Sequence, residues 1–269
     1  MMIRGAVLGS PISHSLSPIL HRTAYEKLGV LGQYQAIDIT PGKLKDFVAG
    51  LDQSWTGLSL TMPLKEEILS IADEVDELAL RINSANTLIR SARGWRALST
   101  DVNGFIQTLS ANGVSNFTNV TILGSGATAR AAAAACDAST RTIKIIHRSQ
   151  EREAAMRRAA PQARLEFAIW GSELTQADLL INATPAGVAD SYSEKLEEDE
   201  LGIYCEALYN PWPTKMLARW RALKGFGIDG LDLLVHQGID QVELMTGKSL
   251  QRSILAPILR TACLAAMRP

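Results

Sequence analysis

The sequence predicts an α/β protein with two domains, an N-terminal α/β domain and a Rossmann-like doubly wound domain, with a cleft between them. Its 269 residues exceed the span of one typical domain, which is about 100 to 200 residues. Strand and helix patterns alternate through the first half of the chain, as in βαβ units. A second alternating series begins near Asn119, and a glycine-rich turn follows its first strand.

The first half contains apolar segments of strand length separated by helical patterns. We expect strands at residues 3–8, 33–38 and 58–60, helices at 18–28 and 42–51, helical turns at 65–70 and 76–82, and a hairpin joining 86–90 to 95–97. Alternation of this kind favours a sheet with helices packed on it.

The second half has the same alternation. We expect strands at residues 120–123, 142–147, 179–182 and 203–208, and helices at 127–136, 150–159, 235–245 and 253–267. The last two helices are expected to return to the first domain. The predicted domains are therefore 1–102 completed by helices in 237–269, and 103–236.

Composition excludes several classes of function. The 27 Lys and Arg residues are scattered among 28 Asp and Glu, with a formal net charge of −1, so no nucleic-acid partner is expected. Cys136, Cys205 and Cys263 lie far apart, which argues against a disulfide framework and against a metal site. No segment resembles a membrane span or a secretory leader. We therefore expect a cytoplasmic protein, a monomer or a homodimer, that binds a small molecule.

The strongest local motif is the run Gly124-Ser125-Gly126-Ala127-Thr128-Ala129, which lies between an apolar strand and a helix. Gly124 permits a tight turn, Gly126 lets the backbone approach a pyrophosphate, and Ala129 keeps helix and strand close. The helix N-terminus attracts negative charge. The alternative is an ordinary glycine-rich turn, but the placement favours a dinucleotide-binding motif.

The end of the next strand indicates which dinucleotide is bound. An NAD-binding fold carries an acidic residue about 20 residues beyond the glycines, where it binds the ribose. Here the strand ends in His147-Arg148-Ser149-Gln150-Glu151-Arg152, without an acid at that point. Arg148 and Arg152 are four residues apart and suit a 2′-phosphate, while Glu151 is expected to face solvent. An arginine pair on a solvated helix is the alternative; the sequence favours NADP(H).

Two hydroxyl side chains precede the first helix. In Pro11-Ile12-Ser13-His14-Ser15-Leu16-Ser17-Pro18, Ser17 is a natural N-cap and Pro18 suits the first helical turn. A carboxylate could accept hydrogen bonds from Ser15 and Ser17 beside the helix dipole, although capping alone explains Ser17 equally well.

Polar residues also follow strand ends. Lys65 in Thr61-Met62-Pro63-Leu64-Lys65 is expected at the carboxyl edge of the first sheet, where open α/β folds bind ligands, and is a candidate proton donor. In isolation such a lysine is usually solvated. Two further runs, Ser84-Ala85-Asn86-Thr87 and Ser99-Thr100-Asp101, have structural Asx-turns as their simpler explanation.

Taken together, these motifs resemble the shikimate dehydrogenase family. The resemblance spans nearly the whole chain, in seven ordered segments: 11–18, 61–65, 85–87, 100–104, 124–130, 182–187 and 230–238. It implies NADPH-dependent, reversible reduction of 3-dehydroshikimate to shikimate, a reaction of aromatic amino-acid biosynthesis.

The resemblance also implies roles for individual residues. Lys65 would be the catalytic acid/base and Asp101 its partner, and the substrate would further contact Ser15, Ser17, Thr61, Asn86, Tyr209 and Gln237. The cofactor would contact Gly124, Ser125, Gly126, Ala127, Thr128, His147, Arg148, Ser149, Arg152, Thr184, Gly187 and Gly230.

The chain departs from the family pattern at several positions. Ser59 replaces the usual Asn of G-x-N-V-T, Ser99 begins the usual N-T-D, and His147 begins the usual N-R-[ST]. None of these departures removes the acid/base pair. A quinate/shikimate dehydrogenase that uses NAD and a non-catalytic nucleotide-binding regulator are the alternatives. Arg148 and Arg152 argue against the first, and retention of Lys65 and Asp101 argues against the second.

Overall fold

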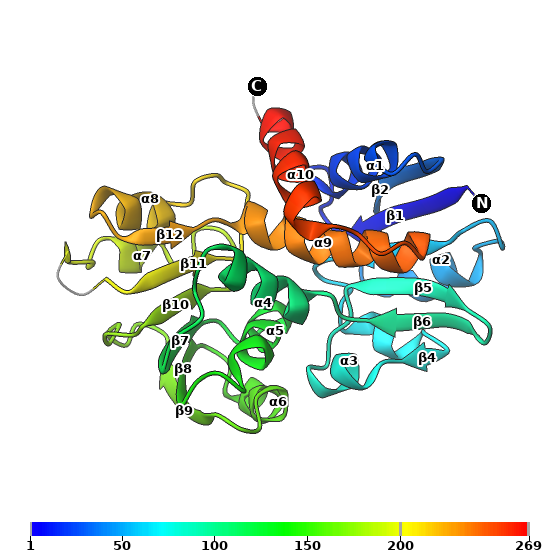
Figure 1. Cartoon of the computed structure of the whole chain (residues 1–269). Helices are drawn as coiled ribbons and strands as arrows, with labels where there is room; N and C mark the ends of the chain where they lie inside the picture. Colours follow the sequence, from blue (N-terminus) through cyan, green and yellow to red (C-terminus); the bar gives the residue numbers. More distant parts are fainter. Residues whose placement is uncertain (1, 199–200, 268–269) are drawn as a thin grey trace. The chain divides into compact units, whose positions relative to one another are not determined.

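The structure is a computed structural model that describes residues 2–198 and 201–267. The chain forms two compact units (Figure 1). The first unit comprises Met1–Gly104 and Leu234–Pro269, and the second comprises Phe105–Leu233. Each contains its own six-stranded sheet, so the predicted α/β class is confirmed for both.

The first unit is built on a mixed sheet with the strand order β2-β1-β3-β5-β6-β4. Its strands are β1 (Ile3–Gly9), β2 (Gly32–Asp38), β3 (Gly57–Leu60), β4 (Glu74–Val75), β5 (Thr87–Ser91) and β6 (Gly94–Leu98). β1 pairs in parallel with β2 and β3, whereas β5 runs antiparallel to β3 and β6. The expected hairpin is therefore confirmed as β5–β6.

Helices on this sheet complete the first unit. They are α1 (Ser17–Lys27), α2 (Leu44–Ala49), the 3₁₀ helix η1 (Glu67–Ser70), α3 (Glu77–Arg81), the part of α9 (Gly230–Thr246) from Leu234 onward, and α10 (Arg252–Ala266). α10 packs against α1, and the chain from Leu234 onward lies in the first unit. The buried apolar core includes Leu8, Leu58, Leu88 and Trp95 from four of its strands.

The second unit is a parallel sheet with the order β12-β11-β10-β7-β8-β9. Its strands are β7 (Asn119–Leu123), β8 (Thr142–His147), β9 (Arg164–Ile169), β10 (Leu179–Asn182), β11 (Ile203–Glu206) and β12 (Phe226–Ile228). The order is that of a doubly wound dinucleotide-binding fold, with the switch point between β7 and β10.

Helices of the second unit form two packed pairs. α5 (Ala127–Cys136) packs on α6 (Glu153–Ala159), and α7 (Asp190–Ser193) packs on α8 (Lys215–Ala222). α4 (Asp101–Ala111) leads into the unit from the first. The alanines of α5 from Ala129 to Ala134 are buried, so their small side chains let this helix lie close to β7.

Several local expectations need correction. Ser17 is not the N-cap of α1: Leu16 occupies that position without a side-chain cap, and Ser17 begins the helix. Residues 150–159 do not form one helix, because a 3₁₀ turn, η2 (Gln150–Arg152), precedes α6. Six elements were not anticipated, namely β4, α4, β9, α7, α8 and β12.

Two findings bear on the wider expectations. Within residues 2–198 and 201–267, no helix has the length and apolarity needed to cross a membrane. The three cysteines Cys136, Cys205 and Cys263 are all buried as free thiols.

Candidate active site

The polar motifs of the first unit meet at one edge of its sheet. Parallel pairing of Leu8 with Leu60 brings the carboxyl ends of β1 and β3 together. Beyond the strands, the amide of Thr61 donates to the Leu8 carbonyl at 2.9 Å and the amide of Ser10 donates to the Met62 carbonyl at 3.2 Å. β5 runs the other way, so Asn86 immediately before it reaches the same edge. This is where ligands bind in α/β sheets.

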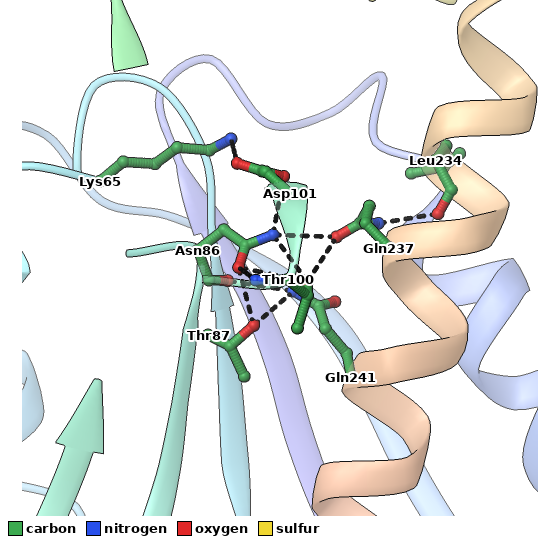
Figure 2. Close-up of polar contacts among 8 residues, drawn as sticks. All are labelled: Lys65, Asn86, Thr87, Thr100, Asp101, Leu234, Gln237 and Gln241. Atoms are coloured by element: carbon green, nitrogen blue, oxygen red, sulfur yellow. Dashed lines mark hydrogen bonds and ion pairs between the residues drawn. The ribbon is translucent and has the colours of Figure 1, made fainter. Parts of the chain in front are cut away.

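Lys65 and Asp101 form an ion pair at this edge (Figure 2). Lys65 Nζ lies 2.6 Å from Asp101 Oδ2, and the two side chains are only 14% and 8% exposed. The Lys65 carbonyl accepts from the Ala85 amide at 2.9 Å, which ties the lysine turn to the segment before β5. A charge-assisted hydrogen bond at this depth fixes the ammonium position well.

Asn86 holds the other oxygen of Asp101. Its Nδ2 donates to Asp101 Oδ1 at 2.8 Å and to Thr100 Oγ1 at 2.9 Å. Its Oδ1 accepts from the Thr100 amide at 2.8 Å and from Thr87 Oγ1 at 2.9 Å. A backbone amide can only donate, so the Thr100 amide fixes Oδ1 of Asn86 on the side that faces Thr100. The NH₂ group of Asn86 therefore points toward the Asp101 carboxylate.

Gln237 joins the same cluster from α9. Its Oε1 lies 3.1 Å from Asn86 Nδ2, and its Nε2 donates to the Leu234 carbonyl at 2.8 Å (Figure 2). A side chain at Gly104 would not fit, since a Cβ there would lie 2.7 Å from the Cβ of Gln237. The glycine thus lets α4 approach α9 closely enough for Gln237 to reach Asn86.

The structure therefore brings together four of the predicted site residues: Lys65, Asn86, Asp101 and Gln237. The sequence did not predict a role for Thr87 or Thr100 in this cluster. Both were visible as neighbours of predicted residues, but their contacts depend on strand pairing that a motif does not reveal. Chemically, the cluster offers a proton donor, a carboxylate beside it and amide groups suited to hydroxyls.

Ser15, Ser17 and Thr61 lie on the segments that leave β1 and β3. The Ser17 amide donates to Ser15 Oγ at 3.3 Å, so Ser15 rather than Ser17 supports the start of α1. Ser17 is buried and Ser15 and Thr61 are half-buried. The contact of these three side chains with substrate remains a prediction.

In the second unit, the glycine motif forms the turn between β7 and α5. Gly124 has φ = +108°, and a Cβ there would lie 3.1 Å from the Ala183 carbonyl oxygen beyond β10. Only glycine adopts this conformation readily. Gly126 is the N-cap of α5, and no side chain of its own blocks the helix end. The turn therefore presents a bare helix N-terminus, as a pyrophosphate requires.

The arginine pair follows β8. Arg148 and Arg152 are exposed, and a guanidinium nitrogen of Arg152 lies 3.7 Å from the Cβ position of Gly126. Arg152 thus adjoins the glycine turn. Glu151 is exposed as expected, and hydrogen bonds from its own backbone amide and from the Ser149 hydroxyl lower the pKa of its carboxyl.

His147 has a different environment from the arginines. It is buried, its Nδ1 lies 3.0 Å from the Ser149 carbonyl, and its Nε2 lies 3.3 Å from Glu153 Oε1. Its ring packs edge-on against Phe167. These contacts support the turn that carries Arg148. A structural role therefore explains the presence of His147 as well as the predicted cofactor contact does.

Glu206, at the end of β11, was not anticipated. It accepts hydrogen bonds from the Tyr204 hydroxyl at 2.7 Å, the Thr214 hydroxyl at 2.8 Å and Asn182 Nδ2 at 3.2 Å. Burial raises the pKa of this carboxyl, and the donors oppose that shift. Because Asn182 Oδ1 accepts from Thr184 Oγ1 at 2.7 Å, Glu206 indirectly holds the loop after β10. An acidic residue directly after an apolar strand segment was the sequence signal that could have identified Glu206.

At two of the predicted cofactor-binding positions, the backbone itself requires a glycine. Gly187 has φ = +79° in the loop after β10. At Gly230 a Cβ would lie 2.2 Å from the Leu208 carbonyl oxygen, so only glycine lets the start of α9 approach the segment that carries Tyr209.

A doubly wound parallel sheet with a glycine turn and an arginine pair, in a chain that also holds a largely buried Lys–Asp pair, is the arrangement expected of a nucleotide-dependent oxidoreductase. Residues 7–88 match the family model described as shikimate dehydrogenase substrate binding domain. A curated shikimate dehydrogenase (NADP(+)) of Thermosynechococcus vestitus is 35% identical over 95% of this chain and 94% of its own length. The chain belongs to the shikimate dehydrogenase family.

Solved structures agree in fold over the whole chain. The shikimate dehydrogenase of Mycobacterium tuberculosis superposes with a TM-score of 0.86 at 33% identity, covering 98% of this chain and 100% of that one. The shikimate 5-dehydrogenase of Thermus thermophilus, solved in complex with NADP(H) and shikimate, gives a TM-score of 0.83 at 31% identity over 97% and 100% of the two chains.

Proposed function

We propose that this chain is an NADP-dependent shikimate dehydrogenase that reversibly reduces 3-dehydroshikimate to shikimate in aromatic amino-acid biosynthesis. The observation that carries the proposal is the largely buried ion pair of Lys65 and Asp101, with Lys65 Nζ 2.6 Å from Asp101 Oδ2 and the other carboxylate oxygen held by Asn86. The family membership and the Thermus thermophilus relative with NADP(H) and shikimate support the choice of ligands.

The second unit has the features that fit NADP(H). Gly124 and Gly126 leave room for the pyrophosphate at the N-terminus of α5, and Arg152 beside Gly126 suits the 2′-phosphate together with Arg148. Thr184, Gly187 and Gly230 are proposed to border the nicotinamide end, and Ser125, Ala127, Thr128, His147 and Ser149 to complete the phosphate and ribose contacts. When bound, NADPH supplies the hydride for the carbonyl carbon.

The first unit supplies the proton and holds the substrate. In our proposal the Lys65 ammonium donates a proton to the carbonyl oxygen as it becomes a hydroxyl, and in the reverse direction the neutral amine takes it back. Asp101 holds Lys65 in place and accepts a hydrogen bond from the substrate hydroxyl beside it. Asn86, Gln237 and Thr61 bind the ring hydroxyls, because amides and hydroxyls both donate and accept.

The substrate carboxylate is proposed to lie at the start of α1. Ser15 and Ser17 would donate to it beside the positive end of the helix dipole, and Tyr209 would approach from the segment after β11. We further propose that the protein works in the cytoplasm as a monomer or a homodimer; the three buried free thiols are consistent with a reducing compartment.

A four-way assay tests this function. Purified protein is given shikimate or quinate with NADP or NAD, and initial rates are measured for each pair. We expect the highest kcat/KM for shikimate with NADP, and no comparable rate in the Lys65→Ala control. A preference for quinate with NAD would favour a quinate/shikimate dehydrogenase, and no turnover in any combination would favour a non-catalytic nucleotide-binding protein.

A further inference from the structure

A second polar cluster lies beneath the proposed active site in the first unit. It consists of His21, Tyr25, Tyr34, Ser59 and Gln241, all buried, and we call it the inner polar cluster. His21 stacks on Tyr34 with ring centroids 3.8 Å apart. Five polar side chains at this depth are costly unless each is hydrogen-bonded, so their mutual arrangement is well determined.

Gln241 connects this cluster to the active site. Its Nε2 donates to the Asn86 carbonyl at 3.0 Å and to Thr87 Oγ1 at 3.0 Å (Figure 2). A backbone carbonyl can only accept, so this contact fixes which end of the Gln241 amide faces Asn86. Gln241 Oε1 therefore faces the other members of the inner polar cluster and must accept hydrogen bonds from them.

The inner polar cluster provides the donors that this oxygen needs. Ser59 Oγ donates to Gln241 Oε1 at 2.7 Å, and the Tyr34 hydroxyl in turn donates to Ser59 Oγ. His21 Nε2 lies 3.3 Å from the same oxygen, so it carries the proton, and Nδ1 accepts from the Tyr25 hydroxyl at 3.2 Å. Burial lowers the pKa of His21 to about 3, so the ring is neutral. Ser59 and His21 thus both donate to Gln241 Oε1.

The same direction continues into the active site. Thr87 Oγ1 accepts from Gln241, so its own proton is available for Asn86 Oδ1, 2.9 Å away. Together with the Thr100 amide, which donates to the same Asn86 oxygen at 2.8 Å, this holds that oxygen away from Asp101 and the NH₂ toward Asp101 Oδ1, at 2.8 Å. A reversed amide would place two oxygens in contact at that point, which is unfavourable. Asp101 Oδ2 is then the oxygen that meets Lys65.

We propose that Gln241 is a positioning residue for the dehydrogenase reaction, acting through Thr87 and Asn86 to orient the Asp101–Lys65 pair. The inference rests on the proposed function for its kinetic consequence, but the geometry it describes does not. Gln241 need not touch substrate, and its effect is transmitted through the orientation of Asn86.

A kinetic experiment compares Gln241→Met with Thr87→Val and the double variant. Each single change should lower kcat by about 10- to 100-fold, the range that small displacements of catalytic groups produce, while KM for NADP stays near the wild-type value. Because both act on the same contact, the double variant should be little worse than the poorer single variant. Thr246→Val is the matched control: it removes a part-buried hydrogen bond on the same helix, from Thr246 Oγ1 to the Val242 carbonyl at 2.7 Å, outside the inner polar cluster, and should keep kcat within about twofold.

The structural arm is a crystal structure of Gln241→Met, which does not depend on activity. We expect the Asn86 side chain to turn or move away from Asp101 Oδ1. Wild-type kcat in Gln241→Met, multiplicative kcat losses in the double variant, or an unmoved Asn86 would overturn the inference. If Gln241→Met does not fold, Thr87→Val, which is isosteric, decides in the same way. A wild-type protein without activity on shikimate would refute the proposed function alone, and the crystal structure would still decide this inference.

Discussion

Replacement of Lys65 by alanine is the perturbation whose effects follow most directly from the structure. The change removes the proposed proton donor and leaves the backbone of the lysine turn, held by the Ala85 amide, in place. Proton transfer by a positioned side chain is worth about 10² to 10⁴-fold in rate. We therefore expect kcat to fall by that factor while KM for shikimate rises much less, because Asn86 and Gln237 remain.

The same substitution should also lower stability. The Asp101 side chain is 8% exposed in the wild-type protein, and after loss of Lys65 its carboxylate still accepts the hydrogen bond from Asn86 but no longer has a cation beside it. Removal of one partner from a buried pair typically costs about 3 to 5 kcal/mol. Since Lys65 itself is 14% exposed at a ligand-binding edge, water can reach the carboxylate, and we expect the lower end of that range.

The double variant Lys65→Ala with Asp101→Asn separates the two effects. Its free energy of unfolding should recover part of the loss, because no uncompensated charge remains, whereas its kcat should stay as low as that of Lys65→Ala. The assays are steady-state kinetics with saturating NADPH and 3-dehydroshikimate, and urea unfolding of the free enzyme. A kcat near wild type in Lys65→Ala, or independent multiplicative effects of the two changes, would refute the assignment of the pair.

Three further predictions concern the carboxylate site, the cofactor and the inner polar cluster. Ser15→Ala and Ser17→Ala should each raise KM for shikimate about 10- to 150-fold, the value of a hydrogen bond to a charged group; unchanged KM in both would place the carboxylate elsewhere. Arg148→Ala with Arg152→Ala should raise KM for NADP about 10² to 10³-fold and leave KM for NAD unchanged, and equal kcat/KM for NAD and NADP in the wild type would contradict this. His21, whose pKa is lowered from 6.5 to about 3, gains no proton in the folded state as pH falls through 6.5, so stability is full above that pH and decreases below it. Urea unfolding should therefore show about 1.4 kcal/mol of additional loss between about pH 7.5 and 5.5 relative to His21→Gln; equal losses in both proteins would count against a neutral buried His21.

The elements that the sequence predicted well are those with one clear signal each. The strand at β7 is mainly apolar and is followed by glycines, and the helix at α5 is rich in alanine. The missed elements had weaker or mixed signals. α4 contains Gly104, which lowers helix propensity but lets Gln237 approach, and β9 at the sheet edge alternates charged with apolar residues.

The candidate site was predictable in its residues but not in its connections. Lys65, Asn86 and Asp101 stood in recognisable motifs, and the sheet places all three at one edge. Ser17 illustrates the limit of local chemistry: its type and position suit an N-cap, yet the chain begins the helix one residue earlier and Ser15 supports the end. Gln241 belongs to none of the motifs. Its contacts could not be predicted locally, because its partners Ser59 and Asn86 lie more than 150 residues away in the sequence.

The most direct test of the account is a crystal structure of the chain with NADP and shikimate bound. We predict that the shikimate hydroxyl to be oxidised lies within hydrogen-bond distance of Lys65 Nζ and Asp101, with its carboxylate on Ser15 and Ser17 and the 2′-phosphate of NADP on Arg148 and Arg152. Shikimate bound away from Lys65 and Asp101, or a 2′-phosphate that contacts neither arginine, would contradict it.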